Sequence, residues 1–522
     1  MEQLLFASGQ TVLEFVQFAD EKRDSGKLSR TRLIVPGGKR MVKWLASIFH
    51  VGDTHEDDNI GDINTQGNIL QLGEAYKYRK DPEHLPPQTA FEKVGDKVRM
   101  FSWMLRSTEC AYGFRVACAT MTIAVIAYLY DTQEFFVRQR LFWAIIMVNL
   151  SMSPTSGQSI FGFVLRILGT VLAMIVCFLS WYIPDEHTAG TLVFFFIFVS
   201  CAFYVPIKMF RFRIIGIITI ITASMIIGYE LQVRKVGEQI ATSNGQAYYP
   251  IYLLAPYRLA TVAGGIGVSF IWTFFPYPMS EHSVLRQSLG ASLYLLANYY
   301  SLNHETVSAR IRGDEGDMAL KTSSGRRLEK ARNQVFSKQM LMLNGLRTYS
   351  GFLRWEVPVG GKFPKRRYDS IINCIEKYAL SPFSTHSVQF ANSSSIVNYL
   401  SLLGYASEAL SKLGTNESES AWIHDFKALI TQARITTHEI TSVLCLLSAS
   451  ITNRQPLPPY LKTPRPYSFS KRLEALDKDI LSIRHMAEPG YAAFSVLQIS
   501  TRCIVGDVDR LLRYVAYASR TG

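Results

Sequence analysis

Apolar residues are concentrated in one block of the chain, from Phe114 to Pro278. Short polar or proline-containing stretches divide this block into six apolar runs, at about residues 114–130, 141–152, 159–183, 189–205, 214–229 and 259–275. A helix needs about 20 apolar residues to cross the hydrocarbon core of a bilayer, so the runs at 141–152 and 214–229 are short for this task. The pattern as a whole predicts six transmembrane helices.

The sequence on either side of the block is mixed in polarity. Beyond it, helical periodicity recurs and strand patterns are few, with helices predicted at 281–302, 324–355, 366–380, 396–413, 420–450 and 468–484. A proline-rich stretch at 455–466 is typical of a stiff linker, the alternative being a ligand for an aromatic groove. Before the block, residues 3–22 have the spacing of an amphipathic helix and residues 51–73 the composition of a loop.

These patterns predict an all-α membrane protein with three regions. Residues 1–112 form a cytosolic N-terminal or linker region, residues 113–278 a six-span transmembrane domain, and residues 279–522 a helical cytosolic domain with the proline-rich linker. The orientation follows from loop charge. The loop at 206–213 has three basic residues and no acid, whereas the loop at 184–187 has two acids. Because basic loops stay on the cytosolic side, we expect both termini in the cytosol.

The formal net charge is +13, and most of the excess lies beyond residue 280. Beside a membrane, such an excess indicates anionic lipid rather than nucleic acid as the partner. The start of the chain lacks the basic and continuous apolar regions of a signal peptide, so insertion is expected to depend on the internal spans.

A short internal repeat relates the two halves of the block. Arg166 is followed by Gly169 and Thr170, and Arg258 is followed by Thr261 and further glycines. With three spans in each half, the second copy is inverted in the membrane. Inverted repeats with interrupted helices are typical of transporters. The predicted arrangement is therefore a 3+3 inverted repeat.

Charge is costly in hydrocarbon, so an arginine inside an apolar run is a candidate functional residue. Arg166 follows a polar break in which Pro154 and Gly157 interrupt the helix. We predict that it binds an organic anion there; the residues of the predicted site are Arg166, Asn149, Thr170 and Arg258. The alternatives are that Arg166 snorkels to headgroups or contacts helix-end carbonyls, and that Arg258 anchors the end of a span.

Enzyme motifs are weak. His304–Glu305 and His438–Glu439 lack the second histidine of a zinc-binding helix, and the glycines at 264–267 lie inside an apolar run rather than in a phosphate-binding loop. The seven cysteines include no CxxC pair. We therefore expect no enzyme, catalytic residue, metal or cofactor. No acidic residue lies in the middle of a run, which favours facilitated efflux or a channel over a self-contained proton antiporter.

Three stretches resemble a known family: FWAIIMVNLSMSPTSGQS from Phe142, RILGT from Arg166 and WYIPD from Trp181. They are similar to the fusaric acid resistance and aromatic acid exporter superfamily, and more narrowly to its fungal branch of brefeldin A sensitivity-related, endoplasmic-reticulum transporters. Residues 18–45 resemble the segment between the two halves of such proteins, and residues 277–392 their C-terminal domain. Members of this branch are about twice as long, so the chain resembles the second half.

The resemblance implies a multi-pass transporter of organic, especially aromatic, anions in the endoplasmic reticulum or the plasma membrane. It also implies either a missing first half or assembly as a homo-oligomer. Plant malate channels have a related fold, so a channel is an alternative to a carrier. The rival hypothesis is a membrane scaffold without transport activity, in which the helical tail and the proline-rich segment bind partners.

Overall fold

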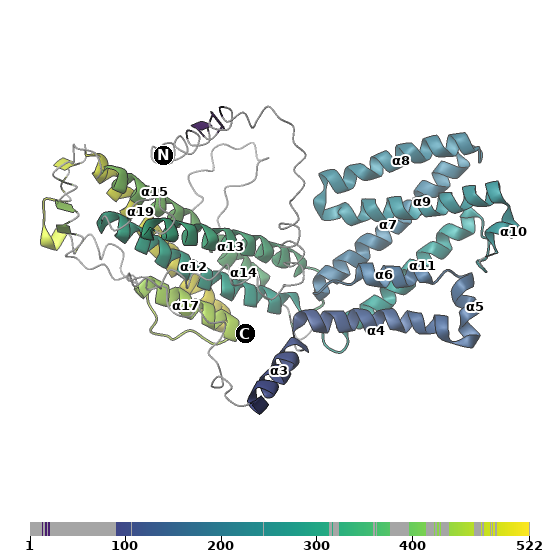
Figure 1. Ribbon diagram of the computed structural model, residues 1–522, viewed down its shortest axis with the longest axis horizontal. Coiled ribbons are helices and arrows are strands. Elements are labelled where there is room, and N and C mark those ends of the chain that lie inside the picture. Colours follow the sequence, from purple (N-terminus) through teal and green to yellow (C-terminus); the bar gives the residue numbers. More distant parts are fainter. Residues whose placement is uncertain are drawn as a thin grey trace. The chain divides into compact units, whose positions relative to one another are not determined.

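The computed structural model describes residues 90–312 except 106 and 244, residues 323–375 except 359, 360 and 362, and residues 396–413, 438–463 and 488–520, with a few shorter pieces elsewhere. Every regular element in this part of the chain is a helix. The chain divides into two compact units (Figure 1). One, called the membrane unit below, comprises residues 84–284 and 349–363. The predictions for residues 3–22 and 51–73 lie almost entirely outside the described residues.

The membrane unit is built from the apolar runs of the sequence. Five of its helices are long and apolar enough to cross a membrane: α4 (Thr108–Tyr128), α7 (Ser156–Tyr182), α8 (Thr188–Lys208), α9 (Arg213–Val236) and α11 (Ile251–Phe274). The run at 141–152 forms the ten-residue helix α6 (Phe142–Ser151), which rises about 15 Å, half the thickness of the hydrocarbon core. The described residues thus contain five candidate spans where the sequence predicts six.

Shorter helices flank the spans. They are α3 (Ala90–Leu105), α5 (Tyr130–Arg138), the 3-10 turn η3 (Phe210–Phe212) and α10 (Glu238–Ala241). Helix α5 lies between α4 and α6 along the chain, and α10 precedes the loop that leads into α11 (Figure 1). These two connections carry residues of the candidate site described below.

Helix α11 begins earlier than the sequence predicts. The apolar run starts at about residue 259, which put Arg258 at the end of a span, but the helix starts at Ile251 and continues through Pro256. Proline usually ends a helix because it lacks an N–H and crowds the preceding turn. Within a bundle of membrane helices the freed carbonyl can be satisfied by neighbours, so proline is tolerated. Arg258 therefore lies seven residues after Ile251, about 10 Å into the helix, and the prediction of a terminal position was wrong.

Helix α7 packs on α9 and α11, and its buried side chains form the centre of the unit. Trp181 and Cys177 of α7 lie against Ile226 and Ile227 of α9 and Ile251 of α11 in one apolar cluster. A second cluster joins α6 to the same three helices through Met147, Phe163, Ile218, Val262 and Ile266. Helix α6 also packs against α4. The short helix is thus held on several sides by longer ones.

Residues 349–363 belong to the membrane unit although they lie far beyond its last span in sequence. They comprise the end of α13 (Ser324–Phe352) and the segment after it. The rings of Phe352 and Trp355 lie 5.6 and 5.2 Å from the ring of Phe161 in α7. This segment covers the first turns of α7.

The second unit includes residues 285–348 and the described residues from 364 onwards. Its helices are most of α12 (Glu281–Arg312) and α13, with α14 (Lys365–Ile375), α15 (Ile396–Leu413), α17 (His438–Asn453) and α19 (Pro489–Arg520). Leu285, Leu289, Leu293 and Leu296 of α12 are fully buried in its core. The helices predicted at 281–302, 324–355 and 396–413 are confirmed. Of the helix predicted at 366–380, residues 366–375 are confirmed and the rest lie outside the described residues, while residues 455–463 of the predicted linker form no helix.

Candidate functional site

The helix break is the segment of residues 152–155 between α6 and α7. Pro154 lacks an N–H, and Thr155 has extended backbone angles (φ −112°, ψ 150°) before α7 begins at Ser156. The Ser159 hydroxyl, in the first turns of α7, bonds both backbone groups of Ser153. It accepts from the Ser153 N–H at 3.0 Å and donates to the Ser153 carbonyl at 3.1 Å. Irregular backbone is therefore supported by protein groups, as a membrane interior requires.

Arg166 reaches from α7 back to this break. Its Nη2 donates to the carbonyl of Leu150, near the C-terminal end of α6, and only 8% of the residue is exposed. Gly162 makes room for the guanidinium, since a Cβ there would lie 2.6 Å from Nη1. The last carbonyls of a helix lack intrahelical partners and carry partial negative charge, so a cation stabilises them. Of the interpretations drawn from the sequence, this contact with a helix-end carbonyl is the one observed.

The other two residues predicted beside Arg166 have their own partners. The Thr170 hydroxyl donates to the Arg166 carbonyl at 2.9 Å, within α7. Asn149 Oδ1 accepts from the Thr120 hydroxyl of α4 at 2.9 Å. Pro154 lies in the helix break, whereas Gly157, predicted to belong to it, is the second residue of α7.

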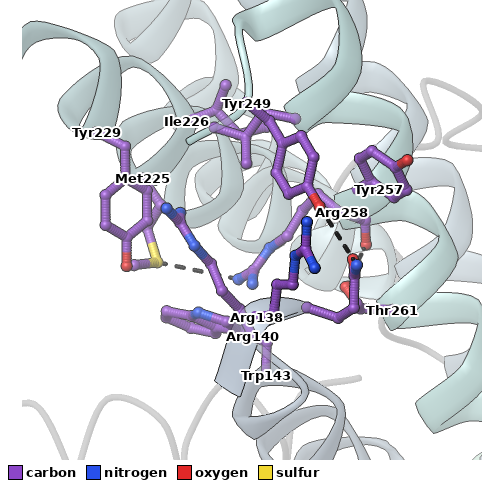
Figure 2. Close-up of a pocket in the computed structure, with 12 residues that line it drawn as sticks. Arg138, Arg140, Trp143, Met225, Ile226, Tyr229, Tyr249, Tyr257, Arg258 and Thr261 are labelled. Carbon is purple, nitrogen blue, oxygen red and sulfur yellow. Dashed lines mark hydrogen bonds between the residues drawn. The ribbon is translucent and has the colours of Figure 1, made fainter. Parts of the chain in front are cut away.

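Arg258 lies in a different place, which we call the arginine cavity (Figure 2). Its walls come from the α5–α6 connection, α9, the loop before α11 and α11 itself. The lining residues are Arg138, Gln139, Arg140, Trp143, Met225, Ile226, Tyr229, Tyr249, Leu254, Tyr257, Arg258 and Thr261. Three arginines and four aromatic residues thus surround a small space of about 30 Å³. This volume holds about two water-sized groups.

Arg258 is 9% exposed and is stacked on an aromatic ring. Its Cζ lies 3.8 Å from the centre of the Trp143 ring, and its Nη2 lies 3.9 Å from the sulfur of Met225. Its Nε is buried without a hydrogen-bond partner in the described part of the chain. Stacking a cation on an indole recovers part of the cost of removing it from water.

Arg140 enters the same cavity from the α5–α6 connection. Its Cζ lies 4.3 Å from the centre of the Tyr229 ring and its Nη2 lies 3.4 Å from the Ala247 carbonyl, while Nε and Nη1 are buried without partners among the described residues. Burial lowers the pKa of Arg140, and the neighbouring Tyr229 and Tyr249 oppose this. Its φ of 55° is uncommon for a residue with a side chain. Such strain is often found where a side chain must be held in a functional position.

The cavity has no acidic counterpart. Among the described residues, no carboxylate forms an ion pair with Arg140 or Arg258. Glu230, next to Tyr229 in sequence, accepts instead from the Tyr248 hydroxyl at 3.0 Å. Burial, followed by this hydrogen bond, raises the pKa of Tyr248 to about 12, so it remains a donor. The positive charge of the cavity is therefore not neutralised by the protein groups described.

The aromatic walls complete the site. Figure 2 shows Tyr249 and Tyr257 next to each other and Trp143 beneath the arginines. The rings of Tyr249 and Tyr257 lie 4.7 Å apart, and Gln139 Nε2 lies 3.3 Å from the Tyr249 oxygen. Hydrogen-bond donors that converge in an aromatic-lined space can receive a carboxylate and contact an apolar ring beside it.

Sequence reasoning identified Arg258 but missed most of its neighbours. Arg140 lies between two apolar runs, Tyr229 ends the apolar run at 214–229, and Tyr249 and Tyr257 precede the run at 259–275, where aromatic residues usually mark the membrane interface. No spacing in the sequence connects these segments. An arginine between apolar runs, together with tyrosines at the same predicted side of the membrane, was the available signal.

Five helices long and apolar enough to cross a membrane are the feature of a multi-pass membrane protein, and two of them, α9 and α11, line the basic cavity. In comparison with known families, the model described as fusaric acid resistance protein-like matches residues 120–272. This stretch includes the helix break, Arg166 and all the residues of the arginine cavity. The match agrees with the resemblance found in the sequence, while the narrower brefeldin A-related branch stays a prediction.

A relative in Schizosaccharomyces pombe (strain 972), itself an uncharacterized protein, is 22% identical over 255 residues. The aligned part covers 47% of this chain and 18% of the relative. The chain therefore spans less than a fifth of the length of the relative that it matches.

Proposed function

We propose that this chain is a membrane transporter that exports small organic anions, aromatic carboxylates among them, through the arginine cavity. The observation that carries the proposal is the pair of buried guanidinium groups, Arg140 and Arg258, whose free N–H groups meet no carboxylate in the described structure. A buried charge without a partner is costly, and inside a membrane protein it usually marks an ion or substrate pathway. The match to the fusaric acid resistance protein-like family supports transport as the function.

The walls of the cavity suggest how a substrate lies. The cavity has a volume of about 30 Å³, which accommodates a carboxylate group but is too small for a whole aromatic acid. In the proposal the carboxylate accepts hydrogen bonds from Arg140 and Arg258, and the ring lies toward Tyr249 and Tyr257. Aromatic faces stabilise both the cations and an aromatic substrate. The site therefore favours an aromatic acid over an aliphatic acid of equal charge.

Arg258 keeps its predicted role as a substrate residue. Arg166 is assigned to the helix break, where it holds the end of α6, and substrate binding by Arg166, Asn149 and Thr170 stays a prediction that the same assay tests. The 3+3 inverted repeat, cytosolic termini, endoplasmic-reticulum or plasma-membrane location and homo-oligomer or two-half assembly also remain predictions.

The test is anion flux in liposomes that contain the purified full chain. We expect benzoate to exchange faster than acetate, and both faster than in protein-free liposomes. Flux that saturates with substrate concentration identifies a carrier, and flux that stays linear identifies a channel. If neither anion moves faster than in protein-free liposomes, the proposal is wrong and the scaffold hypothesis gains support.

A further inference from the structure

A buried carboxyl group lies at the N-terminus of α7, in a part of the membrane unit that contributes no residue to the arginine cavity. Glu281 is the first residue of α12 and is fully buried, although it lies outside the apolar runs. Its Oε1 accepts from the backbone N–H of Gln158 at 3.0 Å and from the Thr155 hydroxyl. Ser156 N donates to the Met279 carbonyl at 3.0 Å. The start of α12 thus holds the start of α7 through a carboxylate and a backbone bond.

The surroundings disfavour the ionised form of this carboxylate. Its Oε2 is buried without a hydrogen-bond partner among the described residues, and no described cation pairs with it. From the 349–363 segment the charged neighbour is Glu356, an acid, which itself bonds His282 of α12 (Nδ1–Oε1, 3.1 Å). The start of α7 contributes only neutral hydrogen-bond donors, the N-cap Thr155 and Gln158 in the first turn.

Burial raises the pKa of Glu281 to about 7, and the negative charge of Glu356 adds to the rise, while the hydrogen bonds from Thr155 and Gln158 oppose it. The carboxyl therefore changes charge in the physiological range. Carboxylates that cap helix N-termini in soluble proteins are usually exposed and ionised, so the buried carboxyl of Glu281 differs from them.

Access to this carboxyl is limited by aromatic residues and by close backbone contact. Phe352 and Trp355 cover Phe161 on the next turn of α7. A Cβ on Gly157 would lie 2.7 Å from the Phe352 carbonyl and 2.9 Å from Glu281 Cγ, so only glycine fits between α7 and these neighbours. Glu281 and Phe352 thus lie against the same turn of α7.

We propose that Glu281 is a proton-binding site that controls the helix break: the ionised carboxylate holds the first turn of α7, and protonation at Oε2 weakens that hold and speeds anion transport. Ionised acceptors form hydrogen bonds about twice as strong as neutral ones, and a negative charge is favoured at a helix N-terminus. The proton comes from water, and no other bond is made or broken. The effect on transport rests on the proposed function, whereas proton binding by Glu281 does not.

The first experiment measures proton binding directly. Infrared difference spectra of the full chain in lipid nanodiscs, between about pH 6 and about pH 8, follow the carbonyl band of a protonated carboxyl group. We expect a band that titrates near neutral pH in the wild type and is lost in Glu281→Gln. In Glu356→Gln the midpoint moves to lower pH because a like charge is removed. If the wild type shows no titrating band that Glu281→Gln removes, the proposal is overturned, whatever the transport result.

The second experiment measures transport at equal pH on both sides of the liposome, with benzenesulfonate as the anion because its charge is constant over this range. We expect wild-type flux to increase several-fold on acidification, Glu281→Gln to stay at the acidic level at every pH, and Glu356→Gln to respond at lower pH. A pH response of Glu281→Gln equal to that of the wild type would refute control of transport by Glu281. Wild-type liposomes that move no anion would instead refute the proposed function, and the infrared result would still decide proton binding.

Stability supplies a third readout. Because the pKa of Glu281 is higher in the folded protein than its ordinary value of 4.5, the folded state binds the proton more tightly and loses stability as pH rises from about 4.5 to about 7. Glu281→Gln removes that loss, so its melting temperature should exceed that of the wild type at about pH 8 and approach it at about pH 5. A melting temperature lowered equally at both pH values would show that Glu281 acts only as a structural contact, and would contradict the proposal.

Discussion

Arg166 and Arg258 occupy similar positions in sequence and different chemical surroundings in the structure. Each lies inside an apolar helix, three or four residues before a threonine, and each is less than a tenth exposed. Arg166 meets a backbone carbonyl at the end of α6. Arg258 meets the Trp143 ring and keeps a buried N–H without a partner among the described residues.

The difference lies in what the neighbouring segments offer. Beside Arg166 the helix break leaves carbonyl groups that need a donor, so the arginine completes the fold. Beside Arg258 the neighbours are aromatic side chains and a second arginine, which satisfy neither its charge nor all its donors. A buried cation that completes the fold and one that awaits an anion can therefore have the same sequence signature.

The largest expected effect concerns the arginine cavity. Arg258→Gln should lower benzenesulfonate flux about 100-fold, because removing one side of a buried charge pair costs about 2–5 kcal/mol. The matched control is Arg138→Gln, which removes the exposed arginine of the same cavity and should change flux less than about twofold. Initial rates normalised to incorporated protein measure both. If both variants lost flux equally, Arg258 would contribute no more to transport than an exposed arginine.

Arg166→Met should act on stability. It leaves the Leu150 carbonyl without its donor in a region with little water, so the unfolding free energy should fall by about 2 kcal/mol, while the KM for anion flux in the surviving protein stays the same. Thermal unfolding in detergent measures this. Thr170→Val, which removes a hydroxyl bonded within its own helix, should cost less than about 1 kcal/mol. A tenfold rise in KM with unchanged stability would place Arg166 at the substrate.

Two glycines test the close contact at the start of α7. Gly157→Ala should destabilise the protein by about 1.5 kcal/mol, because the new methyl group meets the Phe352 carbonyl and Glu281. Gly264→Ala in α11, where a Cβ meets nothing within 4 Å, should be neutral or slightly stabilising. Melting temperatures of the two variants give the comparison. If Gly157→Ala is as stable as Gly264→Ala, residues 349–363 do not pack tightly against Gly157.

The smallest effect concerns the ring beneath Arg258. Trp143→Leu should raise the KM for an aromatic anion about fivefold, or about 1 kcal/mol, since a cation–π contact of this size is lost. Trp143→Phe keeps a ring and should lose less than half of that. The ordering wild type, Phe, Leu is the informative result. An identical KM for the two variants would mean that the ring contributes volume and no specific contact.

Much of the helical framework could be predicted from the sequence. The apolar runs coincide with α4 and α7–α9 because hydrocarbon imposes both length and composition on a span. The start of α11 could not be predicted, since Pro256 has the usual meaning of a helix end and only the surrounding bundle overrides it.

The site was predictable only in part. An arginine among apolar residues is conspicuous, so both Arg166 and Arg258 were found. Their roles depend on residues from other segments: the cavity needs Tyr229, and the break needs Glu281, which no periodicity links to the arginines. Glu281 was not found because it lies outside the apolar runs. It is buried by packing rather than by membrane insertion, and no sequence pattern indicates this.

The membrane unit is discontinuous in sequence, and this has a consequence for how it is made. Its last span ends at Phe274, yet the segment that covers the start of α7 comprises residues 349–363. On a ribosome, the spans have left the exit tunnel before Phe352 and Trp355 are translated, so the helix break must wait for residues that arrive later. Any shortened chain that stops soon after the last span, whether from proteolysis or from early termination, would lack its own cover over Phe161 and Gly157.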